Sequence, residues 1–235
     1  MIKGIYLTGR SLDGKMKCME VIANNLANIN TTGFKREVPF SEIISKAGDI
    51  EIRQVTDFQE GTPSATANSF DFYLSGKAFF TVKTDKGIQL TRNGRFALSD
   101  EGFLVTEEGN KVIGKNGEIN LSKLMLNKET EITVTKEGEI RTGDEILDHF
   151  LIVQMDNHSH LKKVNATNFV YEDGNFQEAD SSDYQVLQGY IEESNINPVI
   201  ELENMIQTNS DYEAGYKMMQ SLDDSLGKAN EIGKI

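Results

Sequence analysis

Apolar residues at helical spacing occupy both ends of this 235-residue chain, and this limits how the chain can fold. Near the N-terminus Ile5, Leu12, Met19 and Leu26 recur every seven residues, with Met16 and Ala23 at intermediate positions. Alternating steps of four and three are typical of a helix that packs along another helix. Because glycines weaken its first turns, we expect this helix, within residues 1–35, to be marginal alone.

A second long amphipathic helix is predicted over residues 198–235. Asn197 is a good cap, and Pro198 fits the first helical position, where no amide donor is needed. Apolar residues then follow at steps of three and four: Val199, Leu202, Met205, Ile206, Tyr212, Tyr216, Met219, Leu222 and Leu226. The two helices can pair only if the intervening residues bring the chain ends together.

Charge favours this pairing. Residues 1–36 carry six cationic and two anionic side chains, net +4, whereas residues 197–235 carry three and seven, net −4. Opposite charge favours association of the two helices and disfavours self-pairing, although exposed pairs contribute only about 0–1 kcal/mol each. Nucleic acid or anionic lipid is the alternative partner for a basic N-terminus. The formal charge of −13 and the lack of a dense basic cluster argue against both.

The central region has the two-residue period of β-strands. Phe70, Phe72 and Leu74 alternate with polar or amphipathic residues, and further strands are expected at 78–82, 149–156 and 184–192. The spacing of glycine-containing turns is typical of antiparallel hairpins. These turns are Asp85-Lys86-Gly87, Asn93-Gly94, Asp100-Glu101-Gly102, Glu108-Gly109-Asn110, Asn116-Gly117, Glu137-Gly138 and Thr142-Gly143-Asp144.

The predicted fold is therefore a mainly β, antiparallel central domain with long helical N- and C-terminal segments that pair in a coiled-coil-like layer. We expect an N-terminal helix over residues 1–35, an extended linker over 36–69 and the β domain over 70–183. A returning β segment over 184–197 would lead into the C-terminal helix.

Three asparagines, Asn24, Asn25 and Asn28, lie at the end of the N-terminal helix, ahead of Gly33. Asn is a poor helix former because its amide competes for backbone hydrogen bonds. One interpretation is that neighbouring chains supply partners for these amides; the alternative is a solvated helix face. Gly33 permits a left-handed backbone where the helix must end.

Four segments resemble the family of bacterial flagellar rod, hook and hook-associated proteins. The first is Ala23-Asn24-Asn25-Leu26-Ala27-Asn28-Ile29-Asn30-Thr31-Thr32-Gly33-Phe34-Lys35. The second begins Thr91-Arg92-Asn93-Gly94-Arg95-Phe96, and the third is Leu187-Gln188-Gly189-Tyr190-Ile191-Glu192-Glu193-Ser194-Asn195-Ile196-Asn197. The fourth is Glu201-Leu202-Glu203-Asn204-Met205-Ile206, and all four occur in the family's order.

The resemblance implies a structural, non-enzymatic subunit of the flagellar rod that assembles helically through its terminal helices. Implied partners are copies of itself, other rod and hook axial proteins, and the flagellar type III export apparatus, which would deliver it to the basal body. Helices that are disordered alone would suit a narrow export channel and become ordered on docking. No cofactor, metal, nucleic-acid partner or membrane insertion is expected.

Two branches of the family fit the chain length. The ending Ser221-Leu222-Asp223-Asp224-Ser225-Leu226-Gly227-Lys228-Ala229-Asn230 and the compact 39–67 segment resemble the proximal-rod branch. The opening Met1-Ile2-Lys3 and residues 19–25 lean towards the distal-rod branch. We favour the proximal branch. Residues 207–213 depart from the family pattern by lacking its usual arginine, so a specific salt bridge there is not carried over.

The predicted assembly interface combines seam residues of both helices with the asparagine motif. It consists of Leu12, Met19, Asn24, Asn25, Leu26, Ala27, Asn28, Gly33, Phe34, Leu202, Met205, Ile206, Tyr212, Tyr216 and Met219.

A β-rich binding module or a one-domain enzyme is the rival class. His158 and His160 with Asp156 could suggest a metal site, but such a cluster is more often a solvated loop. No phosphate-binding loop or nucleophile-elbow motif occurs, and the single cysteine, Cys18, excludes an intramolecular disulfide. No apolar run approaches the ~20 residues that cross a bilayer, and the N-terminus does not resemble a Sec signal peptide.

Overall fold

The computed structural model describes residues 2–44, 49–122, 132–155, 158–171 and 176–232. The chain divides into two compact units. Unit 1 comprises Met1–Ile29, Arg36–Asp57 and Ile196–Ile235, and unit 2 comprises Asn30–Lys35 and Phe58–Asn195. Each unit thus combines residues from the N-terminal and C-terminal parts of the chain, and each is described by itself below.

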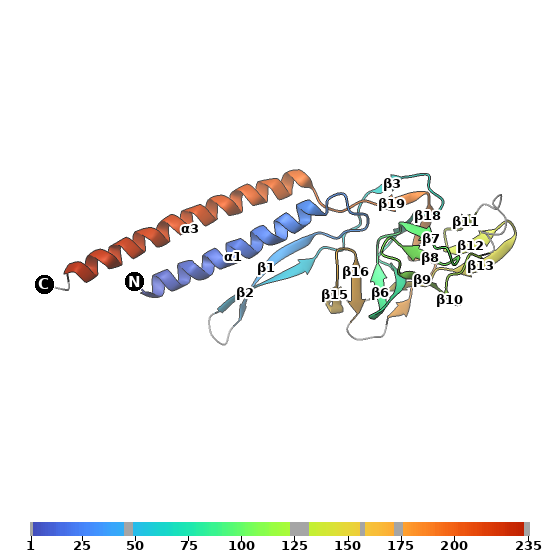
Figure 1. Cartoon of the computed structure of the whole chain (residues 1–235), viewed down its shortest axis with the longest axis horizontal. Helices are drawn as coiled ribbons and strands as arrows, with labels where there is room; N and C mark the ends of the chain where they lie inside the picture. Colours follow the sequence, from blue (N-terminus) through green and yellow to red (C-terminus); the bar gives the residue numbers. More distant parts are fainter. Residues whose placement is uncertain (1, 45–48, 123–131, 156–157, 172–175, 233–235) are drawn as a thin grey trace. The chain divides into compact units, whose positions relative to one another are not determined.

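Unit 1 consists of two helices and a β-hairpin. Helix α1 (Ile2–Ala27) lies antiparallel to α3 (Pro198–Ile232), as Figure 1 shows, and also contacts the hairpin β1 (Glu37–Ile44) and β2 (Asp49–Thr56). The side-chain carbonyl of Asn197 accepts hydrogen bonds from the amides of Val199 and Ile200, which caps α3 as expected.

The antiparallel register of α1 and α3 is constant along their length. A Cβ at Gly4 would lie 3.9 Å from Leu222 Cδ1, and one at Gly215 would lie 3.0 Å from Leu12 Cδ2. Nearer the other end the Lys15 ammonium is 2.5 Å from the Asp211 carboxylate. The residue numbers of each facing pair add to 226 or 227, so the two helices run side by side without a slip.

The hairpin occupies a region where we expected an extended linker. Strands β1 and β2 pair over eight residues each, from Glu37 opposite Thr56 to Ile44 opposite Asp49. Antiparallel pairing provides partners for backbone N–H and C=O groups that an isolated extended segment would leave to water. Helix α1 ends at Ala27, so the residues of the N-terminal motif beyond it are not helical.

Unit 2 is built from antiparallel strands, which confirms the mainly β class predicted for the centre of the chain. Its largest sheet has the order β15-β16-β6-β5-β9-β8-β7, with β10 on β9 and with β14 between β5 and β17. These strands are β5 (Phe79–Thr84), β6 (Gly87–Thr91), β7 (Phe96–Leu98), β8 (Leu104–Thr106), β9 (Lys111–Gly114), β10 (Gly117–Glu118), β14 (Ile152–Gln154), β15 (Leu161–Lys163), β16 (Asn168–Tyr171) and β17 (Gln177–Glu178).

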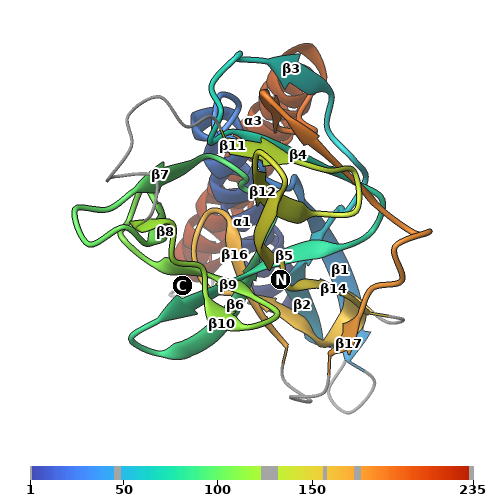
Figure 2. The ribbon, with the colours of Figure 1, turned by 90° about the vertical axis from the view of Figure 1, so that its right-hand side faces the viewer.

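Smaller sheets complete unit 2. Figure 2 faces this unit, with β11 and β12 side by side. Strand β12 also pairs with β13, β4 with β18, and β3 with β19. A short 3-10 helix, η1 (His158–His160), precedes β15. The remaining bounds are β3 (Pro63–Ala65), β4 (Phe72–Ser75), β11 (Ile132–Val134), β12 (Glu139–Thr142), β13 (Glu145–His149), β18 (Gln185–Gln188) and β19 (Tyr190–Glu192).

Two sequence expectations for this region are wrong in detail. Asn93-Gly94 does not close a hairpin, because β6 and β7, which flank it, do not pair. Residues 184–192 do not form one strand, because Gly189 adopts a φ of +81° and separates β18 from β19. The Gly189 amide donates a hydrogen bond to the carbonyl of Asp71 at 2.8 Å, which holds the residue between the two strands in place.

Aromatic rings fill the main core of unit 2. Phe72, Phe80, Phe96 and Phe150 are each at most 3% exposed, and the Phe72–Phe150 and Phe80–Phe150 ring centroids are 5.2 and 5.3 Å apart. Edge-on contacts of this kind add to the free energy gained by burying the rings. Within the residues that the structure describes, no helix is both long enough and apolar enough to span a bilayer.

We expect Gly215→Leu to weaken the pairing of α1 with α3, although Leu is the better helix former. A side chain at Gly215 would press on Leu12, whereas at Gly227, on the same helix, nothing lies within 4 Å of an added Cβ. Gly227→Leu is therefore the matched control, and it should stabilise α3 by up to about 1 kcal/mol. Amide hydrogen exchange in α1 measures the difference, and equal protection in both variants would contradict the register.

Candidate assembly interface

The predicted seam residues of α1 differ widely in exposure. Leu12 is 7% exposed, and Met19 and Leu26 are half-buried. Ala27 is exposed, as are Met16 and Ala23, the intermediate positions of the predicted seam. Lys15 and Ile22, which precede Met16 and Ala23 by one residue, are less exposed than those two residues. The heptad positions of the predicted seam therefore lie on the less exposed face of α1, whereas Met16 and Ala23 do not; α1 packs against both α3 and the hairpin.

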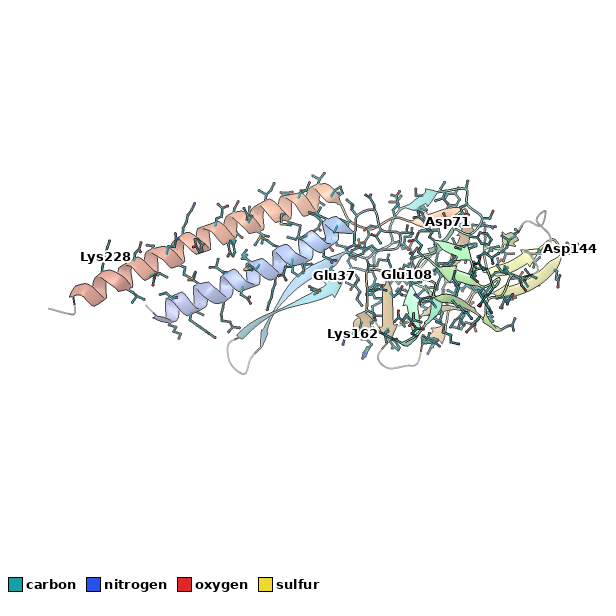
Figure 3. All side chains as sticks on the ribbon, in the orientation of Figure 1. Glu37, Asp71, Glu108, Asp144, Lys162 and Lys228 are labelled. Carbon is teal, nitrogen blue, oxygen red and sulfur yellow. The ribbon has the colours of Figure 1, made fainter. Side chains whose placement is uncertain are left out.

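The predicted residues of α3 fall into two groups. Met205, Tyr212 and Met219 are half-buried. Leu202, Ile206 and Tyr216 are 52%, 68% and 45% exposed and lie off the side that faces α1. In Figure 3 side chains project both towards and away from the space between the two helices, with Lys228 labelled near the end of α3. Some apolar residues of α3 therefore take no part in the contact with α1.

A buried polar cluster joins the end of α1 to the start of α3. Asn25, fully buried, donates from Nδ2 to the carbonyl of Glu37 at 2.8 Å and accepts the Glu37 amide at 2.9 Å. The same Nδ2 lies 3.3 Å from Glu201 Oε2, and Arg36 Nε donates to Glu201 Oε1. Glu37 is labelled beside the end of α1 in Figure 3. We call Asn25, Arg36 and Glu201 the helix-end cluster.

This cluster changes the interpretation of the asparagine motif. The Asn25 amide has its partners within unit 1 and is sealed from the surface, so we withdraw it from the predicted contacts with neighbouring subunits. Asn28 Nδ2 donates to the carbonyl of Asn24, one turn earlier, at 2.9 Å. Asn24 is exposed and Asn28 is half-buried, so these two remain candidate interface residues.

The opposite charges of the two helices meet at Lys15 and Asp211. Lys15 and Asp211 form an ion pair whose side chains are 37% and 39% exposed. Hydrogen bonds from Lys15 and then Gln207 lower the pKa of the Asp211 carboxyl below its usual range. Because the pair is partly exposed, its contribution to stability is small.

The rest of the N-terminal motif belongs to unit 2. Gly33, with φ of +68°, donates its amide to the carbonyl of Glu192 at 2.8 Å. A Cβ at Gly33 would overlap the backbone of Arg92 and Asn93, so only glycine fits. Phe34 is 1% exposed, with Lys163 Nζ 3.8 Å from its ring centroid. Gly33 and Phe34 therefore serve the fold of unit 2, which we did not expect from the sequence.

A buried ion triad holds this segment. Glu192 lies 2.7 Å from Lys35 Nζ and 2.8 Å from Arg92 Nε, and all three side chains are at most 2% exposed. Arg92 also donates to the carbonyls of Leu74, Gly76 and Ala78. Burial, opposed by the Glu192 charge, lowers the pKa of the Lys35 ammonium. We call Lys35, Arg92 and Glu192 the buried triad.

The sequence carries a signal for the buried triad. Each of its members lies in a different one of three family-like segments, and charged residues are rarely fully buried unless they are paired. Periodicity could not place them together, because Lys35 and Glu192 are 157 positions apart.

The histidines are not part of a metal centre in the described residues. The His158 ring stacks on Phe58 with centroids 4.8 Å apart, and His160 lies edge-on to Tyr171. Asp156, the third residue considered, lies outside the described residues. No group of three or more histidine, cysteine, aspartate or glutamate side chains within the described part could hold a metal ion.

Comparison with known proteins gives a consistent assignment along the chain. Residues 17–35 match the family model "Flagella basal body rod protein", and residues 73–142 match "Flagellar hook protein FlgE/F/G D1 domain". Residues 187–232 match "Flagellar basal body rod FlgEFG protein C-terminal". These ranges contain the helix end of α1, much of the large sheet and α3.

Whole-chain relatives agree with the family models. The flagellar basal-body rod protein FlgF of Caulobacter vibrioides is 31% identical over 92% of both chains. The FlgF of Rhizobium meliloti is 28% identical over 98% of both chains. The FlgG of Buchnera aphidicola subsp. Schizaphis graminum is 29% identical over 99% of this chain and all of its own.

We expect Asn25→Ala to lower the free energy of unfolding of unit 1 by about 1–3 kcal/mol, because it leaves buried groups of Glu37 and Glu201 without their partner. Asn24→Ala is the matched control. It removes an exposed amide and raises helix propensity, so stability should hold or rise. Hydrogen exchange of the α1 amides measures the stability of unit 1 in each variant. Equal protection in the two variants would show that the helix-end cluster does not stabilise the unit.

Glu192→Gln should destabilise unit 2 by about 3–5 kcal/mol, because it leaves Lys35 and Arg92 buried without a counter-charge. The exposed neighbouring residue allows a close control, Glu193→Gln, which should change stability by less than about 0.5 kcal/mol. Urea unfolding followed by tyrosine fluorescence compares the variants. Similar midpoints would show that the triad does not hold the unit together.

Proposed function

The chain belongs to the flagellar basal-body rod protein family, and from this membership we propose that it assembles into the rod through its two terminal helices. A structural rod subunit needs no catalytic centre. Its proposed partners are copies of itself and other rod and hook axial proteins. We further propose that the flagellar type III apparatus exports it.

The observation that carries the proposal is the amount of apolar surface left exposed on unit 1. Val199, Leu202 and Ile206 on α3 are 71%, 52% and 68% exposed, and Tyr6 and Leu7 on α1 are 60% and 57% exposed. Contiguous apolar residues on a helix surface mark a site of protein contact. In a rod, neighbouring subunits would cover these residues.

The coiled-coil-like layer predicted from the sequence is part of this proposal. The half-buried positions of α3 after the buried Glu201 include Met205, Thr208, Tyr212, Gly215 and Met219, at alternating steps of three and four. On α1 the corresponding series includes Ile5, Thr8, Leu12, Lys15, Met19, Ile22 and Leu26. Such spacing is typical of helices that pack at a small crossing angle. The pair would form one building block of the tube.

The proximal-rod branch, FlgF, is favoured over the distal-rod branch, FlgG. The alignment with the Buchnera FlgG extends over 269 positions although this chain has 235 residues, so it contains insertions relative to this chain. The alignment with the Caulobacter FlgF extends over 231 positions. The shorter alignment, which needs no long insertion, favours the FlgF branch. A FlgG-type position in the rod is the alternative.

The test uses Ile206→Asp in a flagellated strain whose own rod gene has been replaced by the gene for this chain. Because Ile206 is exposed, the charge should leave folding of the isolated protein unchanged. In an assembled rod the same carboxylate would lose its water, which costs several kcal/mol. We therefore expect normal export of the variant but no incorporation into purified basal bodies, and no motility.

Gln220→Asp is the control, since it adds the same carboxylate at an exposed polar position of the same helix. It should leave basal-body yield and motility close to those of the parent. Full incorporation of Ile206→Asp would refute assembly through this face of α3. Failure of the unmodified chain to enter basal bodies would refute the proposed function itself.

A further inference from the structure

Two surface patches on unit 1 have the same spacing and complementary chemistry; every residue in them is exposed except Arg10, which is half-buried. The cationic patch on α1 consists of Lys3, Tyr6, Leu7 and Arg10. The acidic-apolar patch on α3 consists of Val199, Leu202, Glu203 and Ile206. Both follow i, i+3, i+4, i+7, so each forms a single stripe over two helical turns.

The chemistry of each patch suits the other. The cationic patch has two cations flanking two apolar side chains, and the Arg10 guanidinium carbon lies 5.9 Å from the centroid of the Tyr6 ring. The acidic-apolar patch has three exposed apolar side chains around one exposed carboxylate, Glu203. Contact between them would bury the apolar residues and bring opposite charges together.

The two patches of one chain cannot meet. The register that places Gly4 opposite Leu222 and Lys15 opposite Asp211 puts Tyr6 level with residue 220 of α3. Glu203 is 17 residues from that level, which corresponds to about 26 Å along the helix axis. The patches therefore lie near opposite ends of the helix pair.

We propose that the cationic patch of one copy docks on the acidic-apolar patch of the next copy of this chain. The inference rests on the proposed function and assigns residues to one of its contacts. A contact between two different patches at opposite ends of the helix pair is heterologous. Repeated without closure, it generates a filament rather than a dimer. A second copy is the occupant that fits best, because both complementary halves are present on every chain.

The contact can be tested by disulfide trapping in the purified full-length chain carrying Cys18→Ala. Chains with Leu7→Cys are mixed with chains with Ile206→Cys, oxidised and analysed on a non-reducing gel. A mixture of Leu7→Cys with Met218→Cys is the matched control, because Met218 is 59% exposed but lies on a different face of α3. We expect at least tenfold more cross-linked heterodimer in the first mixture than in the control.

A chain carrying both Leu7→Cys and Ile206→Cys separates open from closed assembly. Residue 7 is level with residue 219, about 20 Å along α3 from residue 206, too far for a disulfide within one chain. We expect a ladder of trimers and longer oligomers. A product that stops at the dimer would indicate a closed two-fold contact and overturn the head-to-tail arrangement.

Charge exchange provides an independent readout. Glu203→Lys in the Ile206→Cys chain should lower the cross-linking yield about fivefold, within the range known for exposed ion pairs. Adding Lys3→Glu and Arg10→Glu to the Leu7→Cys partner should restore it. Loss of yield without restoration would contradict the pairing of these two patches.

Basal-body incorporation of the Cys18→Ala parent distinguishes failure of the inference from failure of the proposed function. If the parent enters basal bodies but the mixture of Leu7→Cys with Ile206→Cys does not cross-link above the control, the inference is wrong and the rod function stands. If the parent does not enter basal bodies, the rod function in this chain is wrong as well, and the inference falls with it.

Discussion

Two buried carboxylates, Glu192 and Glu201, hold the N-terminal and C-terminal parts of the chain together. The adjacent residues Lys35 and Arg36 supply a cation to each, Lys35 to Glu192 within unit 2 and Arg36 to Glu201 within unit 1. Removing one partner from such a buried pair is far more damaging than losing an exposed pair, because the other charge remains without water or counter-ion. These contacts lie where α1 meets α3 and where the Gly33 amide donates to the carbonyl of Glu192 in β19.

The two units differ in how much of their apolar surface is buried. Unit 2 closes its aromatic core around Phe72, Phe80 and Phe150, each at most 1% exposed. Unit 1 leaves apolar side chains of both helices in water, including Ile206 at 68% exposure. Under the proposed function, neighbouring subunits would cover the apolar side chains that unit 1 leaves exposed. The helix-end cluster links the end of α1 to the start of α3, so the exposed patches of the two helices have a defined arrangement within unit 1.

The structure separates residues that the sequence grouped into one motif. The sequence pattern treats Asn24, Asn25 and Asn28 alike, as contacts for neighbouring subunits or as a solvated face, but Asn25 is fully buried and bonded within its own unit, whereas Asn24 is exposed. The sequence predicts Gly33 and Phe34 as interface residues, and the structure packs them inside unit 2. The sequence predicts one strand over residues 184–192, and the structure has two, because Gly189 turns the backbone. In each case a residue's role depends on partners more than 100 positions away or on a local φ that periodicity does not report.

The sequence by itself determined the two terminal helices, the antiparallel β class of the centre, and the family, because period, turn chemistry and motif order are local properties of the chain. It also indicated that the ends of the chain should meet, through their opposite charge and matching apolar stripes. Only the tertiary structure decided which side of each stripe is buried within the chain and which stays exposed. The buried side of each helix is set by the hairpin that packs against α1 and by the pairing of Asn25 and Arg36 with Glu201. A local sequence pattern cannot specify these contacts, because Glu201 lies far along the chain from Asn25 and Arg36.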